Sequence, residues 1–303
     1  MKKENLNLNK YCPICKFTNI SSSKKIYSKH FEMNNLFNLK NCFNCGHKFL
    51  SSFPTVKYLN ELYKFNSKYV FGHEAGEEYE KNKFKQEGFD KVSPFDKHWV
   101  LNFIKTNEVG KYLEIGPGLC RLYKTFYKKN WDCEGLDLQP FIKAPVIKDN
   151  LKEIENNSKD IAVALDVLEH TINPIEFLKE INTKLKKNGK LFLSFPTTDS
   201  FKSKLLGSKW GMVVPLAHLN FFSKKSIQIS LINANFKLIY VRNYSLGKPK
   251  RLFKNFLKLP LKLLKDIIYL DFKKFISRIN EFILSFLDII YGDQMMVVAK
   301  KIK

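Results

Sequence analysis

Four cysteines at low residue numbers form two Cys-x-x-Cys pairs, Cys12 with Cys15 and Cys42 with Cys45. Each pair can present two thiolates to one ion, and four thiolates complete a tetrahedral Zn²⁺ shell with no open coordination position. The closed shell predicts a structural zinc site in a zinc ribbon over residues 1–53. The alternative is two reduced cysteine pairs that bind no metal.

A second group of residues could bind a cofactor. The sequence predicts a buried strand at 112–115, a tight turn at Gly116 and Gly118, and a helix at 121–128. Glycines lack Cβ atoms, so the backbone can pass close under a ligand, and the helix start offers free N–H groups. Asp137, near the end of the next predicted strand, can accept hydrogen bonds from two ribose hydroxyls. The pattern predicts a nucleotide-type cofactor on a doubly wound α/β sheet. A purely structural turn is the alternative.

The rest of the sequence contains the elements that must hold this turn in place. Helices are predicted after the Ser93-Pro94 cap and in two later stretches, at 93–104, 173–186 and 224–233. Apolar stretches bounded by turn residues predict strands at 131–138, 145–148, 160–166, 188–196, 236–242 and 294–300.

Several of these stretches carry recognisable motifs. The turn Leu113-Glu-Ile-Gly-Pro-Gly, the stretch Leu168-Glu-His and the strand from Asn188 to Pro196 resemble motifs of class I S-adenosylmethionine-dependent methyltransferases. The resemblance runs from about residue 99 to 241 and resumes near 294. It departs at Cys120, where the family usually has a third glycine. It implies a seven-stranded, mostly parallel sheet with helices on both faces, and S-adenosylmethionine as cofactor.

The resemblance also implies which residues contact the cofactor. Asp137 would bind the ribose, and Asp149, after the third strand, would bind the adenine amino group. A helix N-cap is the alternative role for Asp149. The full set of predicted cofactor-binding residues is Glu114, Gly116, Gly118, Asp137, Leu138, Asp149 and Asp166.

Three residues are candidates for catalysis. Asp166 ends the fourth strand, where an open α/β sheet places its reacting groups. His170 could act as a general base near the methyl group, or could only shape the loop before a helix. His218 lies in a predicted loop beside aromatic residues and is the strongest candidate for a base. Its alternative role is packing or capping ahead of the next helix.

The charge of the chain bears on its partners. The formal net charge is +23, but only four of the basic residues are arginines, so lysine supplies nearly all of it. Arginine forks are preferred for phosphate and base recognition. We therefore attribute most of the charge to solvated surfaces and do not expect nucleic acid as a partner.

One segment departs from the family pattern. Residues 247–292 precede the last predicted strand and place Lys254, Lys258, Lys262 and Lys265 on one helical face with large apolar residues opposite. This amphipathic insertion is expected to contact an anionic membrane surface. The alternative is a helical hairpin packed on its own domain or on a second subunit.

The location and domain order follow from the remaining stretches. Residues 1–10 lack the apolar run of a signal peptide, and no uncharged apolar stretch reaches about 18 residues, so no transmembrane helix and a cytoplasmic location are expected. The predicted order is zinc ribbon (1–53), connector (54–92), methyltransferase core (93–246), insertion (247–292) and last strand (293–303).

The predicted activity is methyl transfer to a small molecule. A ribbon, a tyrosine-rich connector and this core together resemble zinc-ribbon-fused methyltransferases, which are common in surface-glycan pathways. This implies a sugar or a lipid- or nucleotide-linked glycan precursor as acceptor. One alternative is an RNA methyltransferase that uses the ribbon and lysines. Another is a methyltransferase of a membrane-associated lipid or quinone-type acceptor.

Overall fold

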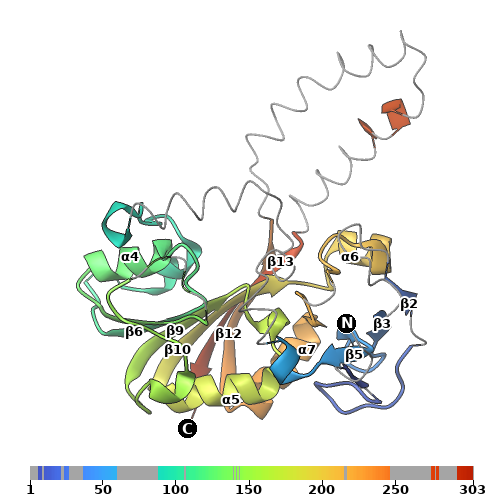
Figure 1. The fold of residues 1–303 in the computed structure, drawn as a ribbon, viewed down its shortest axis with the longest axis horizontal. Coiled ribbons are helices and arrows are strands. Elements are labelled where there is room, and N and C mark those ends of the chain that lie inside the picture. Colours follow the sequence, from blue (N-terminus) through green and yellow to red (C-terminus); the bar gives the residue numbers. More distant parts are fainter. Residues whose placement is uncertain are drawn as a thin grey trace.

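A computed structural model shows how the chain folds (Figure 1). The described residues are 6–8, 10–21, 24–26, 37–59, 88–105, 107–138, 140, 142, 144–214, 217–245, 274–276, 278–279 and 292–302. Within them a large sheet carries helices on both faces, and the N-terminal strands lie beside it.

The large sheet has seven strands in the order β12-β13-β10-β9-β6-β7-β8. Only β13 runs antiparallel to its neighbours β10 and β12. This arrangement confirms the predicted doubly wound, mostly parallel fold. The strands are β6 (Lys111–Ile115), β7 (Asp132–Leu136), β8 (Ile147–Lys148), β9 (Lys159–Leu165), β10 (Leu185–Pro196), β12 (Phe236–Tyr244) and β13 (Gln294–Lys301).

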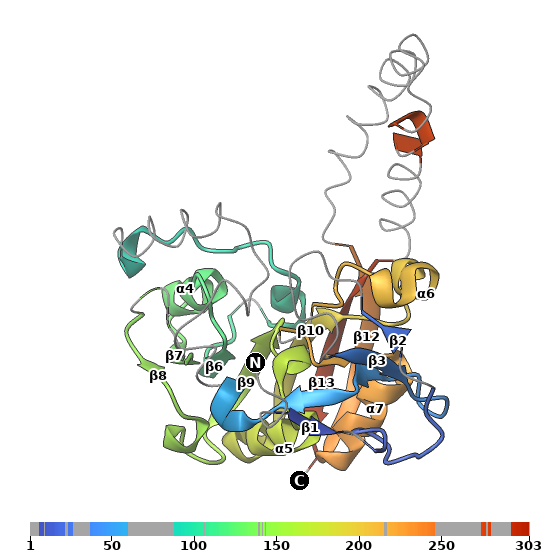
Figure 2. The ribbon, with the colours of Figure 1, turned by 45° about the vertical axis from the view of Figure 1, so that its right-hand side comes forward.

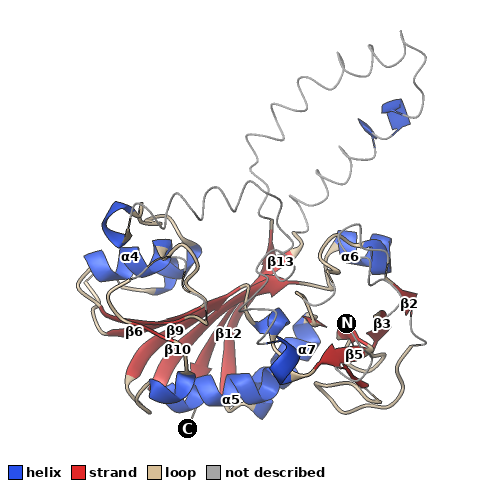
Figure 3. Cartoon of the chain, in the orientation of Figure 1, coloured by secondary structure: helices blue, strands red, loops and turns tan. Residues whose placement is uncertain are grey.

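Alternating side chains give the sheet two buried faces. Along β9, Ile161 and Val163 pack into one core, and Ala162 and Ala164 into the other. Helix α4 (Arg121–Lys128) covers the first face, and helices α5 (Pro174–Lys184) and α7 (Lys224–Asn233) cover the second, as Figure 3 shows. Both faces of a parallel strand are covered in such a fold, so its sequence reads as a continuous apolar run.

The helix predicted at 93–104 is wrong. Residues 93–98 are not helical, and only Trp99–Phe103 forms a short 3-10 turn capped by His98. The backbone of this stretch bonds to α4 instead, because the N–H of Phe95 donates to Oγ1 of Thr125 at 2.8 Å and Nε of Arg121 donates to the carbonyl of Ser93 at 3.1 Å. These tertiary bonds replace those a helix would have made.

The N-terminal strands form two small sheets. One pairs β1 (Leu6–Leu8) with β5 (Ser52–Pro54), and the other has the order β11-β4-β3-β2. Its members are β2 (Lys24–Lys25), β3 (Asn38–Asn41), β4 (Lys48–Leu50) and β11 (Asn220–Phe221). Strand β11 lies inside the predicted core segment and pairs antiparallel with β4. The N-terminal segment is therefore joined to the core by a shared sheet.

Packing reinforces this connection. The N-terminal strands lie beside α7 and α6 (Phe201–Leu206) in Figures 1 and 2. Phe49 and Leu50 of β4 belong to the same apolar core as the residues under α5 and α7. The two segments thus share one core on this side of the sheet.

The predicted insertion at 247–292 lies almost entirely outside the described residues. Its lysine stripe at Lys254, Lys258, Lys262 and Lys265 stays a prediction. Among the helices that the structure describes, none combines the length and the apolar character needed to cross a membrane.

Candidate active site and metal centre

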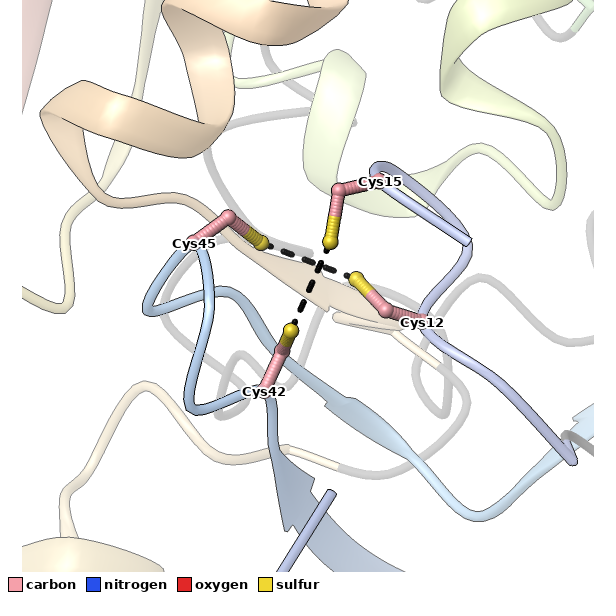
Figure 4. A group of neighbouring side chains, drawn as sticks. All are labelled: Cys12, Cys15, Cys42 and Cys45. Atoms are coloured by element: carbon pink, nitrogen blue, oxygen red, sulfur yellow. Dashed lines mark hydrogen bonds between the residues drawn. The ribbon is translucent and has the colours of Figure 1, made fainter. Parts of the chain in front are cut away.

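The four cysteines predicted to bind zinc come together at one point (Figure 4). Sγ of Cys12 lies 3.6 Å from Sγ of Cys45, and Sγ of Cys15 lies 3.5 Å from Sγ of Cys42. All four sulfurs lie within 4.8 Å of one another, and none is in a disulfide. A tetrahedron with Zn–S bonds of about 2.3 Å has S···S edges of about 3.8 Å. The cluster therefore has the size of a Cys₄ zinc shell.

Backbone turns aim these thiols at the common centre. The N–H of Lys16 donates to the carbonyl of Cys12 at 3.0 Å, and the N–H of Gly46 donates to the carbonyl of Cys42 at 2.9 Å. The hydrogen bond from Cys45 lowers the pKa of Cys12 to about 5 and raises the pKa of Cys45. Negative charge is thus already favoured on one sulfur of the cluster.

A cavity of about 400 Å³ opens at the carboxyl ends of β6, β7 and β9. This is the edge where open α/β sheets bind ligands, and the volume suits a small molecule. The lining residues are Leu59, Ile115, Gly116, Gly118, Leu136, Asp137, Leu138, Asp149, Asn150, Leu151, Asp166, Val167, His170, Thr171, Phe177 and Glu180.

The glycine turn forms the floor of this cavity. Gly116 has a φ of +67°, and a Cβ at this position would lie 2.8 Å from Cγ2 of Val167. Both the positive φ and the short distance to Val167 therefore favour glycine at this position. Cys120, at the position of the missing third glycine, caps α4 with a φ of 54°. It is buried, and burial raises its pKa to about 12, so its thiol is protonated at neutral pH.

The predicted ribose and adenine contacts line the cavity from β7 and β8. Asp137 directly follows β7, and its N–H donates to the carbonyl of Lys148 at 2.9 Å, which fixes the end of the strand. Leu138 is half exposed beside it, and Asp149 lies on the same wall. The N-cap of the following turn is Asn150, whose side chain accepts from the N–H of Lys152. The alternative capping role of Asp149 is therefore filled by its neighbour.

Glu114 lies apart from the other predicted cofactor residues. It is buried on β6 and does not line the cavity. The hydroxyl of Tyr112 donates to its Oε2 at 2.8 Å. Burial raises its pKa to about 8, against the opposing effect of the Tyr112 bond. The predicted contact of Glu114 with the cofactor stays a prediction.

Of the three predicted catalytic residues, Asp166 and His170 line the cavity, and His218 lies beside His170. Asp166 follows β9 with a φ of 54°, an unusual conformation for a residue with a side chain. The hydroxyl of Ser194 donates to its Oδ1 at 3.4 Å, and burial raises its pKa. The rings of His170 and His218 lie 5.0 Å apart, edge to face. Burial lowers the pKa of His170, so its ring is neutral at physiological pH.

The family of this chain follows from its sequence. Residues 89–241, half of the 303-residue chain, match the family described as methyltransferase domain. The chain belongs to the methyltransferase-domain family. Its core is a methyltransferase domain, and the Gly116 turn and Asp137 both line the cavity.

Several solved methyltransferases are similar to this methyltransferase. Haemonchus contortus phosphoethanolamine N-methyltransferase 2 in complex with S-adenosyl-L-methionine is 14% identical, with a TM-score of 0.49, over 84% of this chain and 63% of that one. A second structure of that enzyme, with phosphomonomethylethanolamine and S-adenosylhomocysteine, is 16% identical over the same shares, with a TM-score of 0.48. An S-adenosylmethionine-dependent methyltransferase from Archaeoglobus fulgidus is 13% identical over 79% of this chain and all of that one, with a TM-score of 0.46.

The chain spans 63% of the length of the two Haemonchus contortus structures. No curated protein matches the sequence significantly.

The structure adds residues to the methyltransferase site that the sequence analysis did not assign. Glu169 lies against His170, and Leu59, from the N-terminal segment, lines the cavity. The sequence could have indicated Glu169 as a site residue, because residues 166–170 contain three titratable side chains within five positions. Leu59 could not be predicted as a site residue, because it lies in a stretch of weak helical periodicity that contains no motif.

The buried Glu114 carboxyl of the methyltransferase predicts a pH-dependent stability. Its pKa of about 8 in the folded state exceeds its usual 4.5, so only the unfolded chain loses this proton between those pH values. The free energy of unfolding should therefore fall as pH rises from 4.5 to 8, by about 1.4 kcal/mol per pH unit from this group. Glu114→Gln keeps an acceptor for Tyr112 and should reduce this slope in urea titrations. An unchanged slope would show that the carboxyl ionises normally in the folded protein.

Proposed function

We propose that this protein transfers a methyl group from S-adenosylmethionine to a small-molecule acceptor, namely a sugar, free or linked to a lipid or nucleotide, in surface-glycan assembly. The observation that carries the proposal is the cavity at the strand ends, which is lined by the Gly116 turn, Asp137 and His170. S-Adenosylmethionine, when bound, supplies an electrophilic methyl group, so positioning provides most of the rate enhancement.

The protein's part in the reaction is to hold the two reactants and to act on the acceptor. The turn at Gly116 and the carboxylate of Asp137 hold the cofactor, while Leu138 and Asp149 enclose it. The acceptor must lose a proton when its oxygen or nitrogen takes the methyl group. His170 and His218 act on that nucleophile, since His170 lines the cavity, burial keeps its ring neutral, and the ring of His218 lies 5.0 Å away.

We also propose that Cys12, Cys15, Cys42 and Cys45 hold one structural Zn²⁺. The support is the size of the sulfur cluster and its four free thiols. We further propose that the protein lies in the cytoplasm, with its lysine-rich insertion (247–292) at the inner face of the membrane. This part of the proposal rests on the sequence.

Replacing Asp137 tests the cofactor assignment. Asp137→Ala should lower the affinity for S-adenosylmethionine by about 1.5–3 kcal/mol, because it removes a charged acceptor for the ribose hydroxyls. Calorimetry measures this directly. Asp132→Ala is the matched control, because Asp132 is an exposed aspartate at the opposite end of the same strand. Equal affinities of the folded Asp137→Ala variant and the wild type would contradict the assignment.

The acceptor class is tested with methyl-labelled cofactor and fractionated cell extracts. Label should accumulate in free, nucleotide-linked or lipid-linked sugars and in no macromolecule. Label recovered in RNA would instead support the nucleic-acid alternative, and label in a lipid or quinone without sugar would support the membrane-acceptor alternative.

A further inference from the structure

Beside the cavity lies a buried carboxylate that the cofactor assignment does not use. Glu169 is 1% exposed, and within the described part of the chain neither of its carboxylate oxygens has a hydrogen-bond partner. Buried polar groups almost always have partners, so this site calls for a ligand that the protein itself does not supply.

Two histidines stand next to this carboxylate. Nε2 of His170 lies 4.0 Å from Oε1 of Glu169. One nitrogen of His170, one of His218 and one oxygen of Glu169 all lie within 4.8 Å of one another. Ligands that share a cation at about 2.1 Å lie about 3.0–3.5 Å apart, so small side-chain rotations would bring the three atoms onto one ion.

Backbone carbonyls fix the tautomer of both rings. Nδ1 of His170 lies 2.6 Å from the carbonyl of Ala217, and Nδ1 of His218 lies 2.7 Å from the carbonyl of Met212. A carbonyl accepts only, so each Nδ1 carries a proton and donates it to that carbonyl. Metal-binding histidines are oriented in this way, with the second ring nitrogen donating to a carbonyl or carboxylate.

The chain connectivity places this cluster beside the cavity, with His170 in its wall. The turn Leu168–His170 follows β9, and His170 lines the cavity. The N–H of Leu219 donates to the carbonyl of Glu169 at 2.8 Å, which ties the segment of His218 to this turn. The cluster is thus built from two segments held together by the backbone.

We propose that Glu169, His170 and His218 bind a divalent first-row transition metal ion whose open coordination positions receive the oxygens of the methyl acceptor. Two imidazoles and one carboxylate favour Mn²⁺, Fe²⁺, Co²⁺ or Zn²⁺ over Mg²⁺ or Ca²⁺. Three protein ligands leave room for the acceptor. This role of the ion rests on the proposed function: with both histidines bound to it, the ion would lower the pKa of the acceptor hydroxyl, whose proton passes to solvent when the oxygen takes the methyl group.

Mn²⁺ titration followed by electron paramagnetic resonance tests the site in the full chain, with the cysteine cluster loaded with Zn²⁺. One Mn²⁺ should bind per chain. Glu169→Gln and His218→Asn should each weaken binding by about 100-fold or more, since loss of even a supporting residue costs about 10–100-fold. Glu176→Gln, at an exposed carboxylate of α5 that pairs with Lys179, should bind Mn²⁺ like the wild type.

Two further measurements keep the result decisive. If either variant fails to fold, Co²⁺ titration of the wild-type protein replaces it, because oxygen and nitrogen ligation lacks the thiolate charge-transfer bands of a cysteine site. Binding of Mn²⁺, Co²⁺ or Zn²⁺ only at the cysteines, or equal Mn²⁺ binding by folded Glu169→Gln, would overturn the proposal. Methyl transfer that survives chelation of a bound ion would overturn its role toward the acceptor. Cofactor binding is measured separately, by calorimetry on protein without the added divalent ion. Failure to bind S-adenosylmethionine would count against the proposed function and not against the metal site.

Discussion

Cys42→Ser is expected to unfold the N-terminal segment and also to disorganise the acceptor end of the cavity. A structural zinc ion contributes about 10–16 kcal/mol to the folding of small zinc domains, and removal of one thiolate opens the shell. The sulfurs lie among buried residues of the shared core, with Cys12, Cys42 and Cys45 at most 1% exposed. The N-terminal segment therefore has little to replace the lost ligand.

The effect should reach the cavity because hydrogen bonds connect the two. The hydroxyl of Ser223, which caps α7, donates to the carbonyl of Cys45 at 2.6 Å. His47 bonds to Oδ1 of Asn220 at 3.1 Å, and Nδ2 of Asn220 donates at 2.6 Å to the carbonyl of Thr171, which lines the cavity. Burial lowers the pKa of His47 to about 3, so this ring stays neutral and the chain of bonds carries no charge.

Metal analysis and limited proteolysis measure the outcome. The wild-type protein should contain one zinc per chain. Cys42→Ser should lose it, become sensitive to protease at residues 10–59 and lose methyl transfer, while keeping most of its affinity for S-adenosylmethionine. Cys133→Ser, at a buried cysteine outside the cluster, should keep its zinc. The zinc assignment fails if protein purified without chelator contains no zinc, or if Cys42→Ser retains it.

Gly292→Ala is expected to destabilise the methyltransferase core by about 3 kcal/mol or more. Gly292 has a φ of +54°, and a Cβ there would lie 2.3 Å from the backbone carbonyl carbon of Tyr244. Tyr244 ends β12, and Gly292 precedes β13, which pairs with it. Backbone atoms cannot move aside as a side chain can, so the paired ends of these two strands must separate.

Gly88→Ala separates the two causes of this loss. Gly88 has a φ of +71°, but a Cβ there would have no atom of the described residues within 4 Å. This control should lose only about 1–2 kcal/mol from the left-handed conformation. Urea unfolding of both variants gives the comparison, and equal losses would show that the contact with Tyr244 is not the cause.

The sequence predicted most of the large sheet because its signals are local. The apolar run before Asp166, the glycine turn at Gly116 and the helix at 174–184 each depend on neighbouring residues, and each was predicted within two residues. The same holds for the cavity wall at Asp137 and Asp149. The helix at 93–104 was wrong because its backbone bonds to α4, a distant part of the chain.

Features that depend on distant pairing were not predictable. Nothing in Asn220 and Phe221 indicates that they extend the sheet of the N-terminal segment. The unpartnered state of Glu169 is likewise a tertiary property, since it depends on which groups surround the carboxyl. The cysteine cluster is long-range as well, but two Cys-x-x-Cys pairs are a local sequence signal that is typical of a metal site.

The place of β13 between β10 and β12 constrains the order in which the protein can fold. Until residues 294–301 have left the ribosome, β10 and β12 each present an unpaired edge in the middle of the incomplete sheet. Open edges of apolar strands are sites of aggregation, and pairings between distant residues form slowly. The large sheet therefore stays incomplete until β13 has been synthesised. Chaperones should have their greatest effect on the yield of folded protein during this period.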